Sequence, residues 1–233
     1  MTPLHVFQEL GSASLKDLAV AALKDSFFAG TLKPGDAIVE RKLARQMNVG
    51  SPTVREALIV LQEQGFLRRV ANTATYVTKF RTDEVRDLYA LRVEWEILAF
   101  QWAKPRVTPI DLDRLDAMVD RLVEAGESGN RRRFLEADVE FHDSCWQLSG
   151  NKFLTENLRR LMMPLFTFVV LASGAPLTAS MAREHYALVN ALRNLNEPEF
   201  SVQVRRSLTG FAFRWISTMA SQETLASDPT AAR

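Results

Sequence analysis

The feature that most constrains this chain is a change of pattern near residue 82. Before it, short helical patterns alternate with strand-like stretches. After it, apolar residues keep a helical spacing and no convincing strand pattern occurs. The segments predicted to be helical are 83–104, 108–126, 130–149, 151–173, 178–195 and 198–220. Long helices with short joints predict a mainly α protein whose second part, residues 83–220, is an antiparallel six-helix bundle.

The first part of the chain has a different layout, and it predicts a separate domain over residues 12–80. Helical spacing covers residues 15–28, Gly30 ends that helix, and "LKPGD" forms a turn before a very short strand at Ile38 and Val39. The stretch "ERKLARQM" is a second helix, and a third runs from Ser51 until Gly65 ends it. The stretches "FLRRV" and "TYVTKF", joined by "ANTA", have strand composition. Three helices followed by a strand hairpin are the layout of a winged helix-turn-helix.

Composition permits this two-domain reading and limits the chemistry. The 233 residues are 47% hydrophobic and 24% charged, which is typical of a globular chain. Net charge is only +1, but residues 1–80 carry ten Lys and Arg against seven Asp and Glu, and the rest carries nineteen against twenty-one. The basic amino-terminal part is compatible with DNA binding. The single cysteine, Cys145, excludes an internal disulfide and a multi-cysteine zinc site, and we expect it to be buried.

Targeting and membrane signals are absent from the sequence pattern. No basic-then-apolar leader precedes residue 15, and the most apolar stretch, "LMMPLFTFVVLAS", is interrupted by a proline. We therefore expect a cytoplasmic protein without membrane contact, with this stretch in the core or in a dimer interface. Residues 221–233 have the composition of a disordered tail.

The start of the third helix carries the first functional hypothesis. In a helix-turn-helix the second helix of the pair enters the major groove by its amino-terminal end, where base edges are distinguishable. Ser51, Thr53 and Arg55 are suited to that position, and Pro52 is tolerated in a first helical turn. The alternative is that Ser51 only caps the helix and Arg55 pairs with a nearby carboxylate at the surface. The residues alone leave both interpretations open.

A family resemblance favours the DNA-binding interpretation. The stretch "GTLKPGDAIVERKLARQMNVGSPTVREALIVLQEQGFLRR" resembles the amino-terminal domain of GntR transcriptional regulators. The resemblance implies that Arg41 and Arg55 contact DNA and that Arg45 contacts a phosphate. It further implies a homodimer on a pseudo-palindromic duplex operator, with repression relieved by an effector as the commoner mode of action.

Two departures from the family pattern concern the DNA-contacting residues. Gly50, Ser51 and Pro52 stand where relatives commonly have Ser-Arg-Thr, so one base-reading arginine is absent. The wing tip lacks its usual glycine, and Asn72, which tolerates a left-handed conformation, is expected to take that place. The operator sequence should therefore differ from those that typical relatives read.

The second part of the chain resembles the FCD-type effector domain of the FadR subfamily. The stretches "LYALRVEWEILA", "EADVEFHDSCWQLSGNKFL" and "REHYALVNAL" carry the resemblance. It implies that the domain binds a small organic acid or a similar metabolite. Arg92 matches an arginine that lines the effector pocket, where a guanidinium can hold a carboxylate by two hydrogen bonds. The alternative is a surface ion pair between Arg92 and Glu96, one helical turn away.

Three residues of this domain form a candidate metal site. Asp138 and His142, four residues apart, share one helix face, and His185 on a later helix could join them. Taken alone, a hydrogen-bonded Asp–His pair explains this spacing as well as a metal does. By resemblance, these three match metal ligands of FCD domains, while a fourth ligand, a histidine twenty-two residues after His185, is replaced by Ser207.

The replacement at Ser207 leaves two alternatives for the site. Either three protein ligands hold a divalent transition ion such as zinc or nickel, with positions open for water or an effector carboxylate, or the metal has been lost. Arg92, Asp138, His142, His185 and Ser207 together are the predicted effector site.

These features are compatible with three functions. The leading prediction is a one-component DNA-binding regulator that responds to a carboxylate metabolite. A metal-responsive regulator and a metal-dependent enzyme using Asp138, His142 and His185 are the alternatives. No well-placed general base, nucleophile or phosphate-binding glycine loop accompanies the three residues, so we predict that the protein is not an enzyme.

Overall fold

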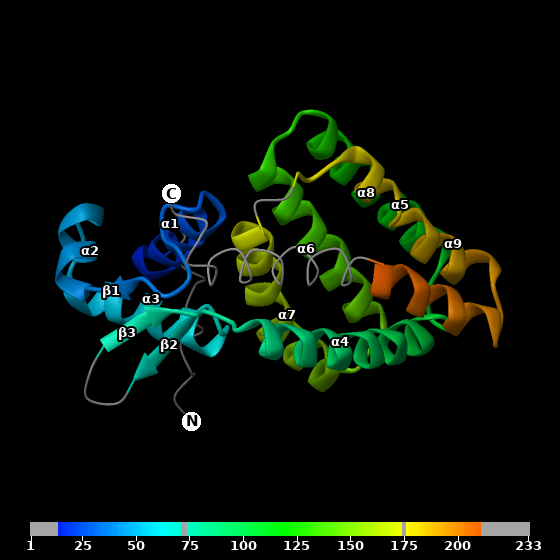
Figure 1. The fold of residues 1–233 in the computed structure, drawn as a ribbon, viewed down its shortest axis with the longest axis horizontal. Helices are drawn as coiled ribbons and strands as arrows, with labels where there is room; N and C mark the ends of the chain where they lie inside the picture. The colour runs from blue at the N-terminus through cyan, green and yellow to red at the C-terminus, as the bar shows by residue number, and fades with distance from the viewer. Residues whose placement is uncertain (1–13, 71–73, 174–175, 211–233) are drawn as a thin grey trace, which may run out of the picture.

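The structure is a computed structural model that describes residues 14–70, 74–173 and 176–210. A small domain of short helices and strands lies at one end of the molecule, and a larger domain of longer helices lies at the other (Figure 1). This confirms the mainly α fold class with a winged helix-turn-helix followed by a helical domain.

The helices and strands of the first domain follow one another in the order expected for a winged helix-turn-helix. Its elements are α1 (Leu15–Phe28), β1 (Ala37–Ile38), α2 (Glu40–Met47), α3 (Ser51–Glu63), β2 (Leu67–Val70) and β3 (Ala74–Val77). Ser14 and Asp17 form a capping box that begins α1. The three strands form an antiparallel sheet in the order β1-β3-β2, with Ala37 opposite Tyr76 and Leu67 opposite Val77. The short strand before α2 is therefore the third member of the wing sheet.

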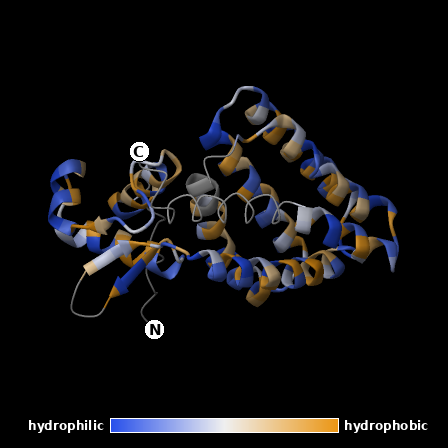
Figure 2. Ribbon diagram, in the orientation of Figure 1, coloured by the Kyte–Doolittle hydropathy of each residue, from blue (hydrophilic) through white to orange (hydrophobic). Residues whose placement is uncertain are grey.

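The helical domain consists of amphipathic helices around an apolar core. They are α4 (Thr82–Ala103), α5 (Pro109–Glu127), α6 (Arg131–Leu148), α7 (Lys152–Ser173), α8 (Ala179–Arg183) and α9 (Tyr186–Asn194), and a further helix covers residues 199–210. Hydrophobic and hydrophilic residues alternate along these helices, as expected for elements with one buried face (Figure 2). Phe100, Phe141 and Phe200 are fully or almost fully buried in the main core cluster.

The prediction of one continuous helix over residues 178–195 is wrong. Residues 178–195 form two helices, α8 and α9, because the chain tightens at Glu184 and His185. The His185 amide donates to the Ala182 carbonyl at 3.1 Å and the Leu188 amide to the His185 carbonyl at 3.0 Å, both three residues back. The described part of this domain therefore has seven helical segments where six were predicted. The end of the predicted helix 198–220, the tail 221–233 and Asn72 lie outside the described residues.

The two domains are packed together through α7. Phe168 on α7 belongs to the apolar core of the winged-helix domain, where its ring meets Phe27 and Phe66 edge-on at centroid distances of 5.7 and 5.9 Å. Asp25 on α1 and Arg132 on α6 form a further contact between the domains, an ion pair of 2.6 Å. Among the described residues, no helix is long and apolar enough to cross a membrane.

Candidate nucleic-acid interface and effector site

The turn between α2 and α3 presents a basic surface. A shallow hollow there is lined by Arg41, Ala44, Arg45, Asn48, Val49, Gly50 and Ser51. Arg41 and Arg45 are exposed, and the Arg45 Nε donates to the Arg41 carbonyl one turn earlier. Asn48 adopts a left-handed conformation with φ of 52°, which turns the chain from α2 into α3. The turn therefore gathers two predicted DNA-contacting arginines beside the start of the predicted recognition helix.

Arg55 lies on the next turn of α3 and is exposed, but it already has a partner. Its Nε and one terminal nitrogen donate to the same Glu40 carboxylate oxygen, at 3.2 and 3.1 Å. Glu40 is the first residue of α2, so the ion pair joins the two helices of the motif. The surface pairing considered for Arg55 is therefore present, and it fixes a guanidinium that remains 64% exposed.

Ser51 and Thr53 lie at the start of α3 and are partly exposed. The cap residue of α3 is Gly50, and no side chain caps this end. The leading amides of the helix are therefore available to an anion, except at Pro52, which has no N–H. The interpretation of Ser51 as a side-chain cap is wrong, because Ser51 is the first helical residue. The sequence did not identify Glu40 as the partner of Arg55. Its position at the start of a helix was the only signal that the sequence offered.

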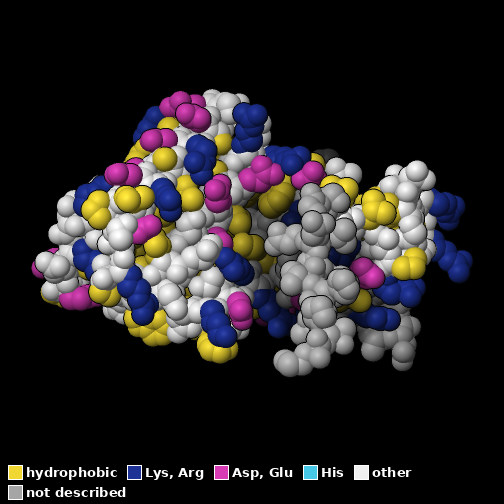
Figure 3. All heavy atoms as spheres, turned by 180° about the vertical axis from the view of Figure 1, so that it is seen from behind, with side chains coloured by type: hydrophobic (Ala, Val, Ile, Leu, Met, Phe, Trp, Pro, Cys, Tyr) yellow, Lys and Arg dark blue, Asp and Glu magenta, His cyan; other side chains and the backbone are white. Residues whose placement is uncertain are grey.

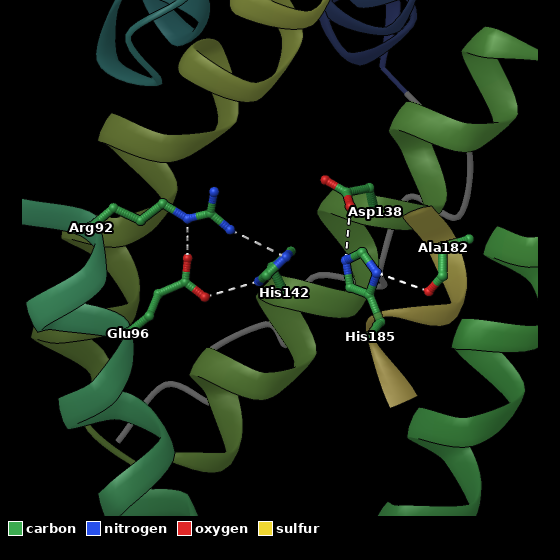
Figure 4. Close-up of polar contacts among 6 residues, drawn as sticks. All are labelled: Arg92, Glu96, Asp138, His142, Ala182 and His185. Atoms are coloured by element: carbon green, nitrogen blue, oxygen red, sulfur yellow. Dashed lines mark hydrogen bonds and ion pairs between the residues drawn. The ribbon is translucent and has the colours of Figure 1, made fainter. Parts of the chain in front are cut away.

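The helical domain encloses a buried polar cluster around Arg92 (Figure 4). Arg92 on α4 is 3% exposed, and its Nε donates to the Glu96 carboxylate at 2.5 Å. A terminal nitrogen of Arg92 lies 3.3 Å from His142 Nε2, and His142 Nδ1 lies 2.9 Å from the other Glu96 oxygen. The Arg92 guanidinium also stacks 4.2 Å from the Phe166 ring centroid. The pairing with Glu96 is present, but it is buried and not at the surface.

The hydrogen bonds define which nitrogen of His142 carries a proton. A guanidinium only donates, so Nε2 of His142 accepts from Arg92, and Nδ1–H donates to Glu96. Burial alone would raise the pKa of the Glu96 carboxyl. The positive charge of Arg92 and the hydrogen bonds from Arg92 and His142 instead hold that pKa at about 2. Glu96 is therefore a buried carboxylate that is paired with the Arg92 guanidinium.

Asp138 and His185 form the second half of the cluster. His185 Nε2 lies 3.1 Å from an Asp138 carboxylate oxygen, and its Nδ1 lies 3.0 Å from the Ala182 carbonyl oxygen. Carbonyl and carboxylate oxygens only accept, so each of these two contacts is a hydrogen bond donated by the His185 nitrogen that it joins. Burial opposes ionisation of Asp138, but the hydrogen bond with His185 and nearby positive charges lower the pKa of Asp138. The break between α8 and α9 places His185 here, because His185 is the residue that precedes α9.

The donor set of this cluster fits a divalent metal ion. One ligand atom each from Asp138, His142 and His185 lie within 4.8 Å of one another. Each histidine donates through Nδ1 to a carboxylate or carbonyl, the orienting contact that metal-binding imidazoles usually have. Imidazole and carboxylate ligands suit zinc, nickel and similar ions. Two observations oppose a metal: the Arg92 cation uses the Nε2 lone pair of His142, and Nε2 of His185 donates to the Asp138 carboxylate.

Two further predicted residues have different surroundings. Ser207, on the helix over residues 199–210, accepts a hydrogen bond of 3.1 Å from Gln203 on the same helix. Its part in the site stays a prediction. Cys145 is fully buried, as expected, and burial raises the pKa of its thiol well above the usual value. Phe166, which covers Arg92, was not recognised, because the stretch "PLFTF" gives only a generic core signal.

Fold and surface define a class of protein: a helix-turn-helix DNA-binding regulator with a helical sensor domain. The comparisons with known proteins agree. Residues 15–77 match the family of bacterial regulatory proteins named gntR, and residues 87–210 match the FCD domain. The chain therefore belongs to the GntR family of transcriptional regulators and carries an FCD domain.

Individual relatives are similar to this chain over part of their length. The uncharacterised regulator YdhC of Bacillus subtilis is 25% identical over 75% of this chain and 79% of its own length. The regulator McbR of Escherichia coli is 27% identical over 60% of this chain and 63% of its own length. The Nta operon regulator of Aminobacter aminovorans is 34% identical over 55% of this chain and 61% of its own length. The solved E. coli McbR structure superposes with a TM-score of 0.74 at 22% identity, covering 91% of this chain and all of that one.

Proposed function

We propose that this regulator is a cytoplasmic one-component repressor that binds a pseudo-palindromic operator as a homodimer and is released by a small organic acid. The observation that carries the proposal is the basic surface at the α2–α3 turn. There the exposed Arg41, Arg45 and Arg55 surround the uncapped amino end of α3. Cationic side chains and free helix amides are the groups that position a protein on the DNA backbone, and Arg55, Ser51 and Thr53 would read bases. Asn72 would act at the wing tip.

The test is the affinity for duplex DNA from upstream of the protein's own gene, compared with random duplex, by fluorescence anisotropy. Affinity should fall steeply as salt rises, because phosphate contacts release counterions. Replacing Arg55 by Ala should cost about 1–3 kcal/mol of binding free energy, and Arg45→Ala should reduce the salt slope by about one. The matched control is Arg121→Ala, since Arg121 is an exposed, ion-paired arginine on α5. Equal affinity for both duplexes would contradict the proposal.

The effector site is proposed to lie around Arg92, Asp138, His142, His185 and Ser207. The Glu96 carboxylate already accepts a hydrogen bond from the Arg92 guanidinium. An effector carboxylate that binds Arg92 therefore has to displace the Glu96 carboxylate. A thermal-shift screen of central metabolic acids and sugar acids tests this, because a ligand that binds the native state stabilises it. Glu96→Gln should raise the affinity for any acid found, because the competing negative charge is gone. Unchanged affinity would place the ligand elsewhere.

A divalent transition ion is proposed as a cofactor held by Asp138, His142 and His185. The orientation of both imidazoles supports this, and the ion would supply positions for water or an effector carboxylate. Metal content of protein purified without chelator, before and after dialysis against zinc or nickel, is the measurement. A stoichiometric ion that is lost in His185→Ala supports the proposal, and a metal-free protein after dialysis contradicts it. We infer that these residues bind and do not catalyse, since the relatives are regulators.

A further inference from the structure

Three charged side chains join α1 of the winged-helix domain to α6 of the helical domain, and we call them the α1–α6 latch. A terminal nitrogen of Arg132 on α6 donates to the Asp25 carboxylate on α1 at 2.6 Å. The Arg132 Nε donates to the Glu136 carboxylate at 2.8 Å. Glu136 lies one helical turn after Arg132, and a guanidinium is planar, so this second bond aims the terminal nitrogen at α1. Charged side chains of both signs gather at the upper edge of the junction between the two domains (Figure 3).

The α1–α6 latch lies apart from the apolar contact between the domains. That contact is made by Phe168 on α7 with Phe27 and Phe66, and all three residues are at most 2% exposed. The side chains of the α1–α6 latch are instead between 42% and 49% exposed. The junction therefore has a buried apolar contact on α7 and a charged contact on α6 at its rim. Contacts with one helix leave rotation about that helix possible, and a contact with a second helix restricts this rotation.

The helix that carries Arg132 also carries two residues of the proposed effector site. Asp138 and His142 follow Arg132 by six and ten residues on α6, which is about 9 and 15 Å along the helix axis. Their side chains are hydrogen-bonded to residues on other segments, so an effector that rearranges these bonds acts on α6 directly. Helices at switching interfaces shift by about 1–2 Å. A shift of that size breaks the hydrogen bond between Arg132 and Asp25, because such a bond is lost beyond about 3.5 Å.

We propose that the α1–α6 latch transmits the state of the effector site to the DNA-binding domain. It is closed in the effector-free repressor and opens when an effector moves α6. This inference rests on the proposed function and concerns its regulation. The closed form holds the two winged-helix domains of the homodimer in the orientation that fits both operator half-sites. The open form lets each domain rotate, and the apparent operator affinity falls with the fraction of dimers that keep the fitting orientation.

The exposure of the α1–α6 latch suits a switch. An ion pair this exposed favours its closed form only a few-fold in population. An effector therefore needs only a small preference for the open form to separate the pair. A homodimer has two copies of the α1–α6 latch, and both winged-helix domains must fit the operator together. Opening both copies therefore multiplies the loss of operator affinity.

The experiment measures binding of the full-length protein to duplex DNA by fluorescence anisotropy. One duplex carries the palindromic operator from upstream of the protein's own gene, and the other carries a single half-site, which engages one winged-helix domain. Asp25→Arg and Arg132→Glu each place like charges together at the α1–α6 latch. Each should lower the ratio of operator affinity to half-site affinity about fivefold or more, since repulsion replaces attraction in both protomers. The double variant Asp25→Arg with Arg132→Glu should restore the ratio, because the two charges are exchanged.

A double-mutant cycle tests the link to the effector site. His142→Gln removes the imidazole from the buried cluster and should lower the same ratio, because it disturbs the position of α6. In the Asp25→Arg background, His142→Gln should have little further effect, because the α1–α6 latch is already open. Additive losses would show that the two sites act independently, and would overturn the proposed transmission.

The matched control is Arg183→Glu. Arg183 on α8 pairs with Glu127 on α5 at 2.7 Å, and the side chains are 55% and 57% exposed, but both belong to the helical domain. This variant should keep the wild-type ratio, and half-site binding retained by every variant shows that it is folded. An unchanged ratio in Asp25→Arg and Arg132→Glu, a double variant that does not recover, or an equal loss in Arg183→Glu overturns the role of the α1–α6 latch. A wild type that binds the operator no more tightly than random duplex contradicts the proposed function itself.

Discussion

Arg92 has two interpretations from the sequence, and the structure bears on its pairing with Glu96. The spacing to Glu96 predicted an ion pair worth a few tenths of a kcal/mol on a surface, and the family resemblance implied a residue that lines the effector pocket. The structure has the pair, and it lies in the interior beside His142. Spacing identifies the partner, but burial depends on the packing of Phe166 from α7, which local sequence does not contain.

Burial of this pair gives a stability prediction at the residue scale. Arg92→Ala leaves the Glu96 carboxylate buried without its counter-charge, and breaking a buried pair in this way should cost about 3–5 kcal/mol of unfolding free energy. Arg205→Ala on the neighbouring helix removes an equal charge from an exposed pair with Glu94, and should cost less than about 1 kcal/mol. Urea unfolding monitored by circular dichroism measures both. Similar costs for the two variants would show that the Arg92 pair is not a buried one.

At the scale of elements, α7 is the helix that serves both domains. Pro164 lies inside α7 and has no N–H to donate to the Arg160 carbonyl four residues earlier. Gly65, at the turn that ends α3, lies against this carbonyl, such that a Cβ atom would be 2.6 Å from its oxygen. The end of the recognition helix therefore packs against the backbone of the sensor domain, at the point where a proline interrupts the helical ladder.

A substitution at Gly65 should disturb this contact more than it disturbs the local backbone. Gly65 has φ of +80°, and Gly129, which is in open space, has φ of +64°. Gly129→Ala therefore measures the backbone cost alone, about 1–2 kcal/mol. Gly65→Ala should exceed it by a further ~1–3 kcal/mol from overpacking against Arg160. Thermal or urea unfolding of the two variants compares these costs, and equal values would mean that the domains separate freely at this point.

The elements themselves could largely be predicted from the sequence, because capping residues, glycines and apolar spacing act locally. The helix over residues 15–28 and the helices beside the turn at Asn48 agree closely with the structure. The break at His185 could not be predicted, since no proline or glycine marks it. Its position depends on a ring-to-carbonyl hydrogen bond and on Asp138 from a different helix. The same holds for Glu40 and Phe166, whose roles arise from contacts between distant segments.

For the whole molecule, the central question is how a change in the sensor domain reaches DNA. Phe166 and Phe168, two residues apart on α7, have different neighbours: Phe166 covers Arg92, and Phe168 lies in the winged-helix core with Phe27 and Phe66. A shift of α7 on effector binding would therefore move a core residue of the DNA-binding domain. Coupling through one packed helix requires that this helix has two arrangements which the ligand can select.

The coupling can be tested without an effector. Phe168→Ala should cost about 3–5 kcal/mol, as for other buried phenylalanines, and Phe200→Ala in the sensor core should cost the same amount. The two variants should differ in where protection is lost. Amide hydrogen exchange of α1 and α3 should accelerate strongly in Phe168→Ala, because their core loses its contact with α7, and should change little in Phe200→Ala. If both variants accelerate exchange equally in α1 and α3, stability is shared by the whole molecule and α7 has no special part in linking the domains.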